Sequence, residues 1–162
     1  MSDFTLRAMS EADATYLSRL NFLTDVFGDE SAEPSSHFEE EYKFYVGQWT
    51  PESGGFIAWD GIIPAGGAWL NWGTDAHHGA GFVKEGIPEV AIAVESRYQG
   101  QGLASLLFDA LIDLAREQGA PGICLAVDTR NESARAIYEH KGFEFAAEVP
   151  DSHYISMVKH FS

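Results

Sequence analysis

The sequence predicts a single α/β (α+β) domain spanning residues 1–162, with a central mixed sheet and helices on both faces. The length of 162 residues and a hydrophobic content of 45% are typical of one globular domain. Apolar residues recur at helical spacing in several segments, and short apolar runs of strand length separate these segments. This alternation favours a sheet that is covered by helices on both sides.

The chain begins with a short strand and an amphipathic helix. A strand is expected at residues 4–8, where Phe4 and Leu6 share one face. Residues 10–13, Ser-Glu-Ala-Asp, match a capping box, in which a serine and an acid three positions later satisfy amides at a helix start. The apolar residues that follow recur at helical spacing: Tyr16, Leu20, Leu23 and Phe27. Gly28 marks the expected end of this helix.

A hairpin is expected further along the first half. Residues 29–36 read as a loop, residues 38–49 as a second helix or part of one, and residues 51–55 as a turn. The pair Asp60-Gly61 separates two apolar runs and is a strong hairpin signal, because the central positions of that turn favour positive φ. Gly66 and Gly67 indicate a bulge or bend in the second strand of the hairpin.

The second half alternates strands and helices. After a loop at residues 73–88, a strand is expected at residues 89–94, and another at 123–127. Between these strands, an apolar stripe predicts a helix capped by Gly119: Leu103, Leu106, Leu107, Ala110, Leu111 and Leu114. Asn131 caps a short helix with Ala134, Ile137 and Tyr138 on one face, which Lys141 and Gly142 end. Two final strands follow, at residues 145–149 and 153–158.

The charge of the chain excludes some classes of partner. Ten Lys and Arg residues against 25 Asp and Glu residues give a net charge of −15, of which residues 1–81 carry −10. Such a field repels phosphate backbones, so a nucleic-acid partner is not expected. It favours cationic small molecules or basic peptides, although acidic surfaces also serve solubility alone.

The location expected from the sequence is the cytoplasm. No apolar run approaches the ~20 residues that a membrane span needs, so no membrane partner is expected. No signal peptide is visible at the start of the sequence. The one cysteine, Cys124, has no partner for an internal disulfide, which favours a reducing compartment.

Residues 99–104, Gln-Gly-Gln-Gly-Leu-Ala, carry the most informative chemistry. They join an apolar strand to the leucine-striped helix, whose first amides lack partners within the helix and lie at its positive end. Gly100 and Gly102 keep side chains away from these amides, and Ala104 is small. We call residues 99–104 the anion seat, because they suit a phosphate or pyrophosphate. The same pattern also occurs in ligand-free turns, and it matches neither a P-loop nor a dinucleotide fingerprint.

At these residues the chain resembles the GNAT superfamily of acetyl-CoA-dependent N-acetyltransferases. Gln99, Gly102 and Ala104 match the family pattern Gln/Arg-x-x-Gly-x-Gly/Ala, and residues 131–143 match its later pattern of Asn, Ala, Tyr and Gly-Phe. The order of the elements also matches, so the resemblance covers nearly the whole chain. It implies a mostly antiparallel sheet with splayed fourth and fifth strands. One departure is Ser96, where many members have proline, which is expected to loosen the connection.

The resemblance implies a role for each matching residue toward acetyl-CoA, the expected acyl donor. The backbone of Ile92, Ala93 and Val94 pairs with the pantetheine arm like an added strand. Asn131 hydrogen-bonds the donor, and Tyr138 lies near its sulfur. The pyrophosphate is held by the amides of the anion seat: Gln99, Gly100, Gln101, Gly102, Leu103 and Ala104.

The chemistry of acyl transfer gives Tyr138 and Glu89 candidate catalytic roles. A departing thiolate needs a proton or a hydrogen-bond donor, and a phenol supplies either, so Tyr138 is the expected acid unless it is only a core aromatic. Glu89 stands where some family members carry a carboxylate base, and otherwise is a solvated strand-end residue. His77 and His78 are alternative bases or an exposed loop pair.

No metal site and no covalent acyl-enzyme are expected. Residues 75–78, Asp-Ala-His-His, lack a further ligand pattern. Cys124 lies in an apolar strand and is expected to be a buried, inert thiol. Direct attack of the acceptor on the donor in a ternary complex is therefore favoured.

The expected acceptor is an amine, either a small cationic molecule or a basic peptide. Acidic residues beside aromatic rings suit a cation, and the first half carries most of the negative charge. Nine aromatic residues crowd residues 38–72, and core or homodimer contacts are the other use for them. The alternatives to this function are a non-catalytic acyl-CoA-binding module, or transfer of another acyl group or to an oxygen acceptor.

Overall fold

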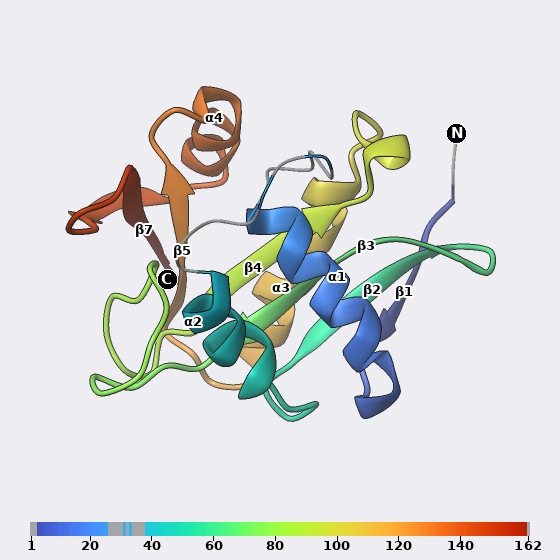
Figure 1. Ribbon diagram of the computed structural model, residues 1–162, viewed down its shortest axis with the longest axis horizontal. Helices are drawn as coiled ribbons and strands as arrows, with labels where there is room; N and C mark the ends of the chain where they lie inside the picture. The colour runs from blue at the N-terminus through green and yellow to red at the C-terminus, as the bar shows by residue number, and fades with distance from the viewer. Residues whose placement is uncertain (1–2, 26–30, 32, 34–37, 162) are drawn as a thin grey trace. The chain divides into compact units, whose positions relative to one another are not determined.

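The computed structural model describes residues 3–25, 31, 33 and 38–161 and divides into two compact units. Unit 1 comprises residues 1–71 and 91–114, and unit 2 comprises residues 72–90 and 115–162 (Figure 1). The described strands follow the hydrogen-bonded order β1-β2-β3-β4-β5-β7-β6. The pairs β1–β2, β2–β3, β5–β7 and β6–β7 are antiparallel, and the β4–β5 pair is parallel. The predicted mixed, mostly antiparallel sheet is therefore confirmed.

Unit 1 opens with strand β1 (Thr5–Ala8) and helix α1 (Ala14–Asp25), joined by the short 3-10 helix η1 (Glu11–Asp13). The capping box is confirmed, because the Asp13 carboxylate accepts a hydrogen bond from the Ser10 amide at 2.8 Å. The expected helix end at Phe27 and Gly28 lies outside the described residues. The helix expected within residues 38–49 is present as α2 (Phe38–Tyr42), continued by the π-helical turn η2 (Lys43–Gly47).

The hairpin of unit 1 consists of β2 (Gly55–Asp60) and β3 (Ile63–Asn71). Its turn lies one residue later than the Asp-Gly pair suggested: Asp60 pairs with Ile63, so Gly61, at φ +64°, and Ile62 form the connection. The register shifts where Ala58 pairs with Gly66 and Trp59 with Pro64, which leaves one extra residue in β3. This is the irregularity that the two glycines predicted.

The two hairpin glycines are also required by close packing. A Cβ at Gly66 would lie 2.7 Å from the Ala93 carbonyl oxygen of β4 (Glu89–Val94), and one at Gly67 would lie 2.7 Å from Leu20 of α1. Figure 1 shows α1 on the viewer's side of β2 and β3, and α3 on the far side. One core cluster of unit 1 joins apolar side chains from α1, η2 and the hairpin with Met9, which follows β1: Met9, Leu17, Leu20, Phe44, Tyr45, Ile57 and Trp69.

Helix α3 (Leu103–Glu117) begins in unit 1 and ends in unit 2. Its leucine stripe is buried at Leu103, Leu107 and Leu111, while Leu106 remains 42% exposed. The predicted C-cap is confirmed, because Gly119 adopts φ +84° and donates its amide to the Arg116 carbonyl at 3.0 Å.

Unit 2 contains β5 (Gly122–Asp128), α4 (Glu132–His140), β6 (Glu144–Glu148) and β7 (Tyr154–His160). Strand β7 pairs antiparallel with both β5 and β6. The parallel ladder between β4 and β5 joins Glu89 to Cys124. Among the described residues, no later residue of β4 enters this ladder, which agrees with the predicted splay of the fourth and fifth strands.

Candidate functional site

The anion seat begins with an exposed turn, residues 99–102, whose glycines are required by the backbone. Gly100 and Gly102 both adopt φ +79°, and a Cβ at either position would meet no atom within 4 Å. The glycines therefore serve the left-handed conformation and leave open space above the turn. In the helix that follows, Leu106 donates to the Gly102 carbonyl at 3.2 Å, so the amides of residues 103–105 precede the first helical bond. This geometry suits an oxyanion.

The turn that leads into the anion seat is fixed by Tyr98. It begins as the 3-10 helix η3 (Ser96–Tyr98), and the Tyr98 side chain is buried. The Tyr98 hydroxyl donates to the Asp60 carboxylate at 2.8 Å, and this hydrogen bond raises the pKa of Tyr98. The Phe4 ring contacts the Tyr98 ring edge to face at 5.7 Å. Serine at position 96 thus begins a turn that side-chain contacts hold in place.

The end of β4 that precedes the turn, residues 91–94, is half-buried in unit 1. Ile92, Ala93 and Val94 are each of intermediate exposure, and Gly66 allows β3 to approach Ala93 closely. These residues and the anion seat are near one another in the chain and belong to the same unit.

Glu89 is a buried carboxylate, not a solvated strand-end residue. Its relative exposure is 3%, because a loop folds against it: a Cβ at Gly81 would lie 2.8 Å from the Glu89 carboxyl carbon. Gly81 also sits so near β5 that a Cβ would be 2.5 Å from the Leu125 carbonyl carbon. The alternative of a solvated strand-end residue is therefore wrong, and a carboxyl group is buried inside unit 2 at the start of β4.

Cys124 is buried and poorly suited to nucleophilic chemistry. Its exposure is 0%, and its Sγ contacts the Pro88 carbonyl oxygen at 3.6 Å. Burial raises the pKa of the Cys124 thiol, and the neighbouring Glu89 charge raises it further. A thiol held protonated at neutral pH is a weak nucleophile. The prediction of a buried, inert cysteine is confirmed.

Asn131 caps helix α4 of unit 2, and Tyr138 lies on it. The Asn131 side-chain oxygen accepts from the Ala134 amide at 3.3 Å, so this residue is the helix N-cap and its amide NH₂ remains the group suited to an external acceptor. Tyr138 is half-buried and packs on Phe143, with the ring centroids 6.1 Å apart. Burial raises the pKa of Tyr138 above its ordinary value of 10.0, so the phenol is protonated at neutral pH.

The two loop histidines are exposed side chains. His78 stacks on Phe82 at 4.3 Å, and its Nδ1 lies 2.8 Å from the Gly79 carbonyl oxygen. Within the part of the chain that the structure describes, no group of three or more His, Cys, Asp and Glu side chains is arranged to hold a metal. None of the described helices combines the length and apolar character that crossing a bilayer requires.

The aromatic residues of the first half are mainly core. Phe44, Tyr45 and Trp69 are buried, and Trp49 and Trp59 pack against the same cluster. The Trp69 indole donates to the Tyr45 carbonyl at 2.9 Å within this core. Most of these rings are therefore not available to bind a cation. Exposed rings such as Tyr42 and Trp72, each 36% exposed, remain available.

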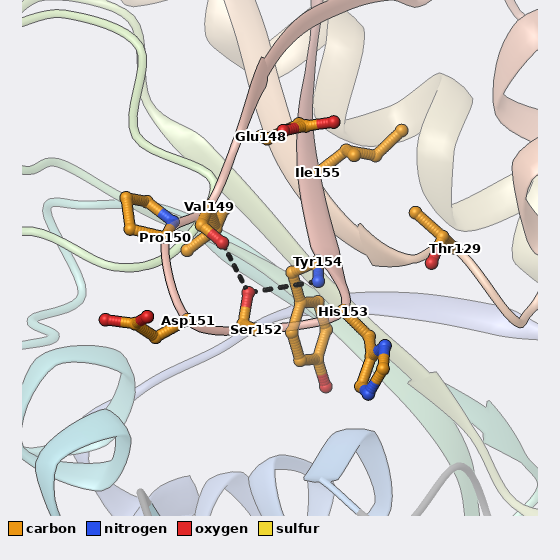
Figure 2. A pocket seen from close by; sticks show the side chains of 9 residues that line it. All are labelled: Thr129, Glu148, Val149, Pro150, Asp151, Ser152, His153, Tyr154 and Ile155. Atoms are coloured by element: carbon orange, nitrogen blue, oxygen red, sulfur yellow. Dashed lines mark hydrogen bonds between the residues drawn. The ribbon is translucent and has the colours of Figure 1, made fainter.

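A polar hollow that sequence reasoning missed lies at the β6–β7 turn in unit 2 (Figure 2). Its volume is about 410 Å³, and its lining includes two exposed carboxylates, Glu148 and Asp151, with His153 and Tyr154. The Ser152 hydroxyl braces the turn by donating to the Val149 carbonyl at 2.9 Å and accepting from the Tyr154 amide at 3.0 Å. Asp151 adopts φ +58°, a conformation that nothing in the local sequence pattern indicated.

Comparisons with known proteins agree on one family. The model of the acetyltransferase (GNAT) family matches residues 23–143. N-alpha-acetyltransferase 30 of Schizosaccharomyces pombe is 32% identical over 115 residues, which is 69% of each chain.

Solved structures support the same fold. The ribosomal-protein-S18-alanine N-acetyltransferase of Escherichia coli is 22% identical, with a TM-score of 0.69 over 99% of this chain and 95% of that one. An N-acetyltransferase of Thermoplasma acidophilum, solved with coenzyme A, is 13% identical, with a TM-score of 0.70 over 98% of this chain and 99% of that one.

Proposed function

The chain belongs to the GNAT acetyltransferase family, and from that premise we propose that it transfers an acetyl group from acetyl-CoA to an amine by direct attack. The observation that carries the proposal is the anion seat, an exposed turn with two left-handed glycines at the start of α3. A diphosphate needs such a local site in a chain of charge −15. The Thermoplasma relative that binds coenzyme A supports the identity of the donor.

The proposed donor contacts use backbone groups first. Backbone atoms of Ile92, Ala93 and Val94 would bind the pantetheine arm. The Asn131 amide NH₂ would donate a hydrogen bond to acetyl-CoA. The pyrophosphate would be held by the amides of the anion seat: Gln99, Gly100, Gln101, Gly102, Leu103 and Ala104. We further propose that residues 1–162 act as one N-acetyltransferase domain, because the family model matches the continuous stretch of residues 23–143.

Tyr138 is the proposed acid. Attack of the amine nitrogen on the thioester carbonyl forms the C–N bond and breaks the C–S bond, so a thiolate leaves. An ordinary thiol has a pKa of about 8.5, whereas burial raises the pKa of Tyr138 above 10.0. Complete proton transfer from the phenol is therefore uphill, and its main contribution is a hydrogen bond that stabilises the departing thiolate.

Glu89 is the proposed base. An acceptor amine is mostly protonated at neutral pH and must lose a proton before its nitrogen attacks. Glu89 is a buried carboxylate in the same unit as Tyr138. It would accept that proton directly or through water.

The acceptor we propose is a cationic amine, and its positive charge would be received at the β6–β7 hollow. The exposed carboxylates of Glu148 and Asp151 attract a cation there, and the volume of about 410 Å³ lies in the range of small-ligand sites. The yeast relative named as an N-alpha-acetyltransferase favours the amino terminus of a peptide among such amines.

An acceptor panel tests the function. Release of CoA is measured with a thiol reagent for peptides with free and blocked amino termini and for small amines of opposite charge. The expected result is release with free, cationic acceptors and reduced release in the double variant Glu148→Gln/Asp151→Asn. No release with any amine, by a protein that binds acetyl-CoA, would indicate a non-catalytic binding module.

A further inference from the structure

We propose that Arg19 is a positioning residue for acetyl-CoA, acting through Glu95 on the turn that carries the anion seat. The inference rests on the proposed function, since it concerns the same seat. Glu95 directly follows β4 and precedes η3, so its position determines where the turn begins. Arg19 lies on α1 of the same unit.

Both oxygens of the Glu95 carboxylate are engaged by α1. The Arg19 guanidinium donates from Nε to Oε2 at 2.8 Å and from Nη2 to Oε1 at 2.6 Å. Tyr16, one helical turn earlier, donates its hydroxyl to Oε2 at 2.7 Å. Two parallel hydrogen bonds from one guanidinium to one carboxylate fix the direction of the carboxylate as well as its distance. Arg19 therefore orients the Glu95 carboxylate in addition to attracting it.

The backbone of Glu95 is held at the same time. Its amide donates to the Ala65 carbonyl of β3 at 2.9 Å, and its carbonyl accepts from the Tyr98 amide at 2.9 Å. The Tyr98 hydroxyl then binds Asp60 at the end of β2 at 2.8 Å. The turn is thus attached to α1 at its start and to β2 at its end.

Burial and charge give the contact its strength. The Glu95 side chain is 12% exposed and that of Arg19 is 40% exposed. The Arg19 hydrogen bonds lower the pKa of Glu95, while burial and the Glu95 hydrogen bond raise the pKa of Tyr16. Arg19 therefore also neutralises an acidic group that stands four residues before the anion seat, where an unpaired charge would repel a diphosphate.

Calorimetric titration of coenzyme A into Arg19→Gln tests the proposal. The expected Kd rises about 2- to 30-fold, the range for coupling through packed contacts, while kcat at saturating acetyl-CoA stays near that of the wild type. Arg7→Gln is the matched control: Arg7 is an exposed arginine of the same unit, stacked on Trp59 at 5.5 Å, and it carries the same charge. Its Kd should equal that of the wild type.

The outcomes separate this inference from the proposed function. No binding of coenzyme A by the wild type would overturn both. Binding by the wild type with an equal Kd in folded Arg19→Gln, or an equal rise in Arg7→Gln, would overturn only the role of Arg19. If Arg19→Gln does not fold, Arg19→Lys is measured in its place, because lysine keeps the charge but cannot form two parallel hydrogen bonds to a carboxylate. A Kd for coenzyme A raised at least about twofold in Arg19→Lys supports the proposal, and an unchanged Kd refutes it.

Discussion

The Gly102→Ala variant separates backbone strain from ligand binding in the anion seat. Gly102 adopts φ +79° with no atom within 4 Å of an added Cβ. Gly119, at the other end of α3, adopts φ +84° with equally open surroundings. The two positions therefore impose the same conformational penalty on alanine, and they differ in their place relative to the proposed diphosphate.

The expected magnitudes follow from these two observations. A non-glycine residue in the left-handed region costs about 1–2 kcal/mol, so Gly102→Ala and Gly119→Ala should lose similar stability. Only the methyl group at residue 102 would lie beside the ligand. Losing one hydrogen bond to a charged group costs about 1.5–3 kcal/mol, which corresponds to a Kd raised roughly 10- to 150-fold.

Two measurements on both variants distinguish backbone strain from loss of ligand binding. Urea denaturation gives the free energy of unfolding, and calorimetric titration with coenzyme A gives the Kd. The expected pattern is a similar loss of stability in both variants and weakened binding in Gly102→Ala alone. Wild-type affinity in folded Gly102→Ala would refute the assignment of the seat, and equal weakening in Gly119→Ala would show that strain alone impairs binding.

Four further predictions concern the proposed chemistry and the acid stability of unit 1. Tyr138→Phe should slow single-turnover transfer roughly 10²- to 10³-fold, the range for removing one hydrogen bond to a developing anion, with little change in Kd, and an unchanged rate would make Tyr138 a packing residue. Because burial raises the pKa of Tyr138, the wild-type rate should not fall through its ionisation below pH 10.0. Glu89→Gln should slow single-turnover transfer with little change in the Kd for coenzyme A, and a rate like that of the wild type would exclude Glu89 as the base. Arg19 holds the folded pKa of Glu95 below its ordinary 4.5, so their ion pair stabilises the fold at neutral pH and is lost on acidification. The stability difference between wild type and Arg19→Gln should therefore shrink as the pH falls through the acid range, whereas a constant difference would contradict the argument.

Local signals in the sequence were sufficient for the order of the elements. The capping box at Ser10, the glycine cap at Gly119 and the N-cap at Asn131 each depend on groups within a few residues, and each is present. The left-handed turns at Gly100 and Gly102 are of the same kind, since glycine alone adopts them without a penalty.

Contacts between distant segments were decided only by the tertiary structure. The sequence left Glu89 open as a solvated residue, and its burial depends on a loop that folds over it near Gly81. The pairing of Arg19 with Glu95 joins residues 76 positions apart, and no local periodicity indicates it. The aromatic residues of the first half illustrate the same limit, because composition shows how many rings there are, whereas packing decides that Phe44 and Trp69 fill a core. Local hydrogen bonding is encoded over a few residues, but burial and ion pairing depend on which surfaces the whole chain brings together.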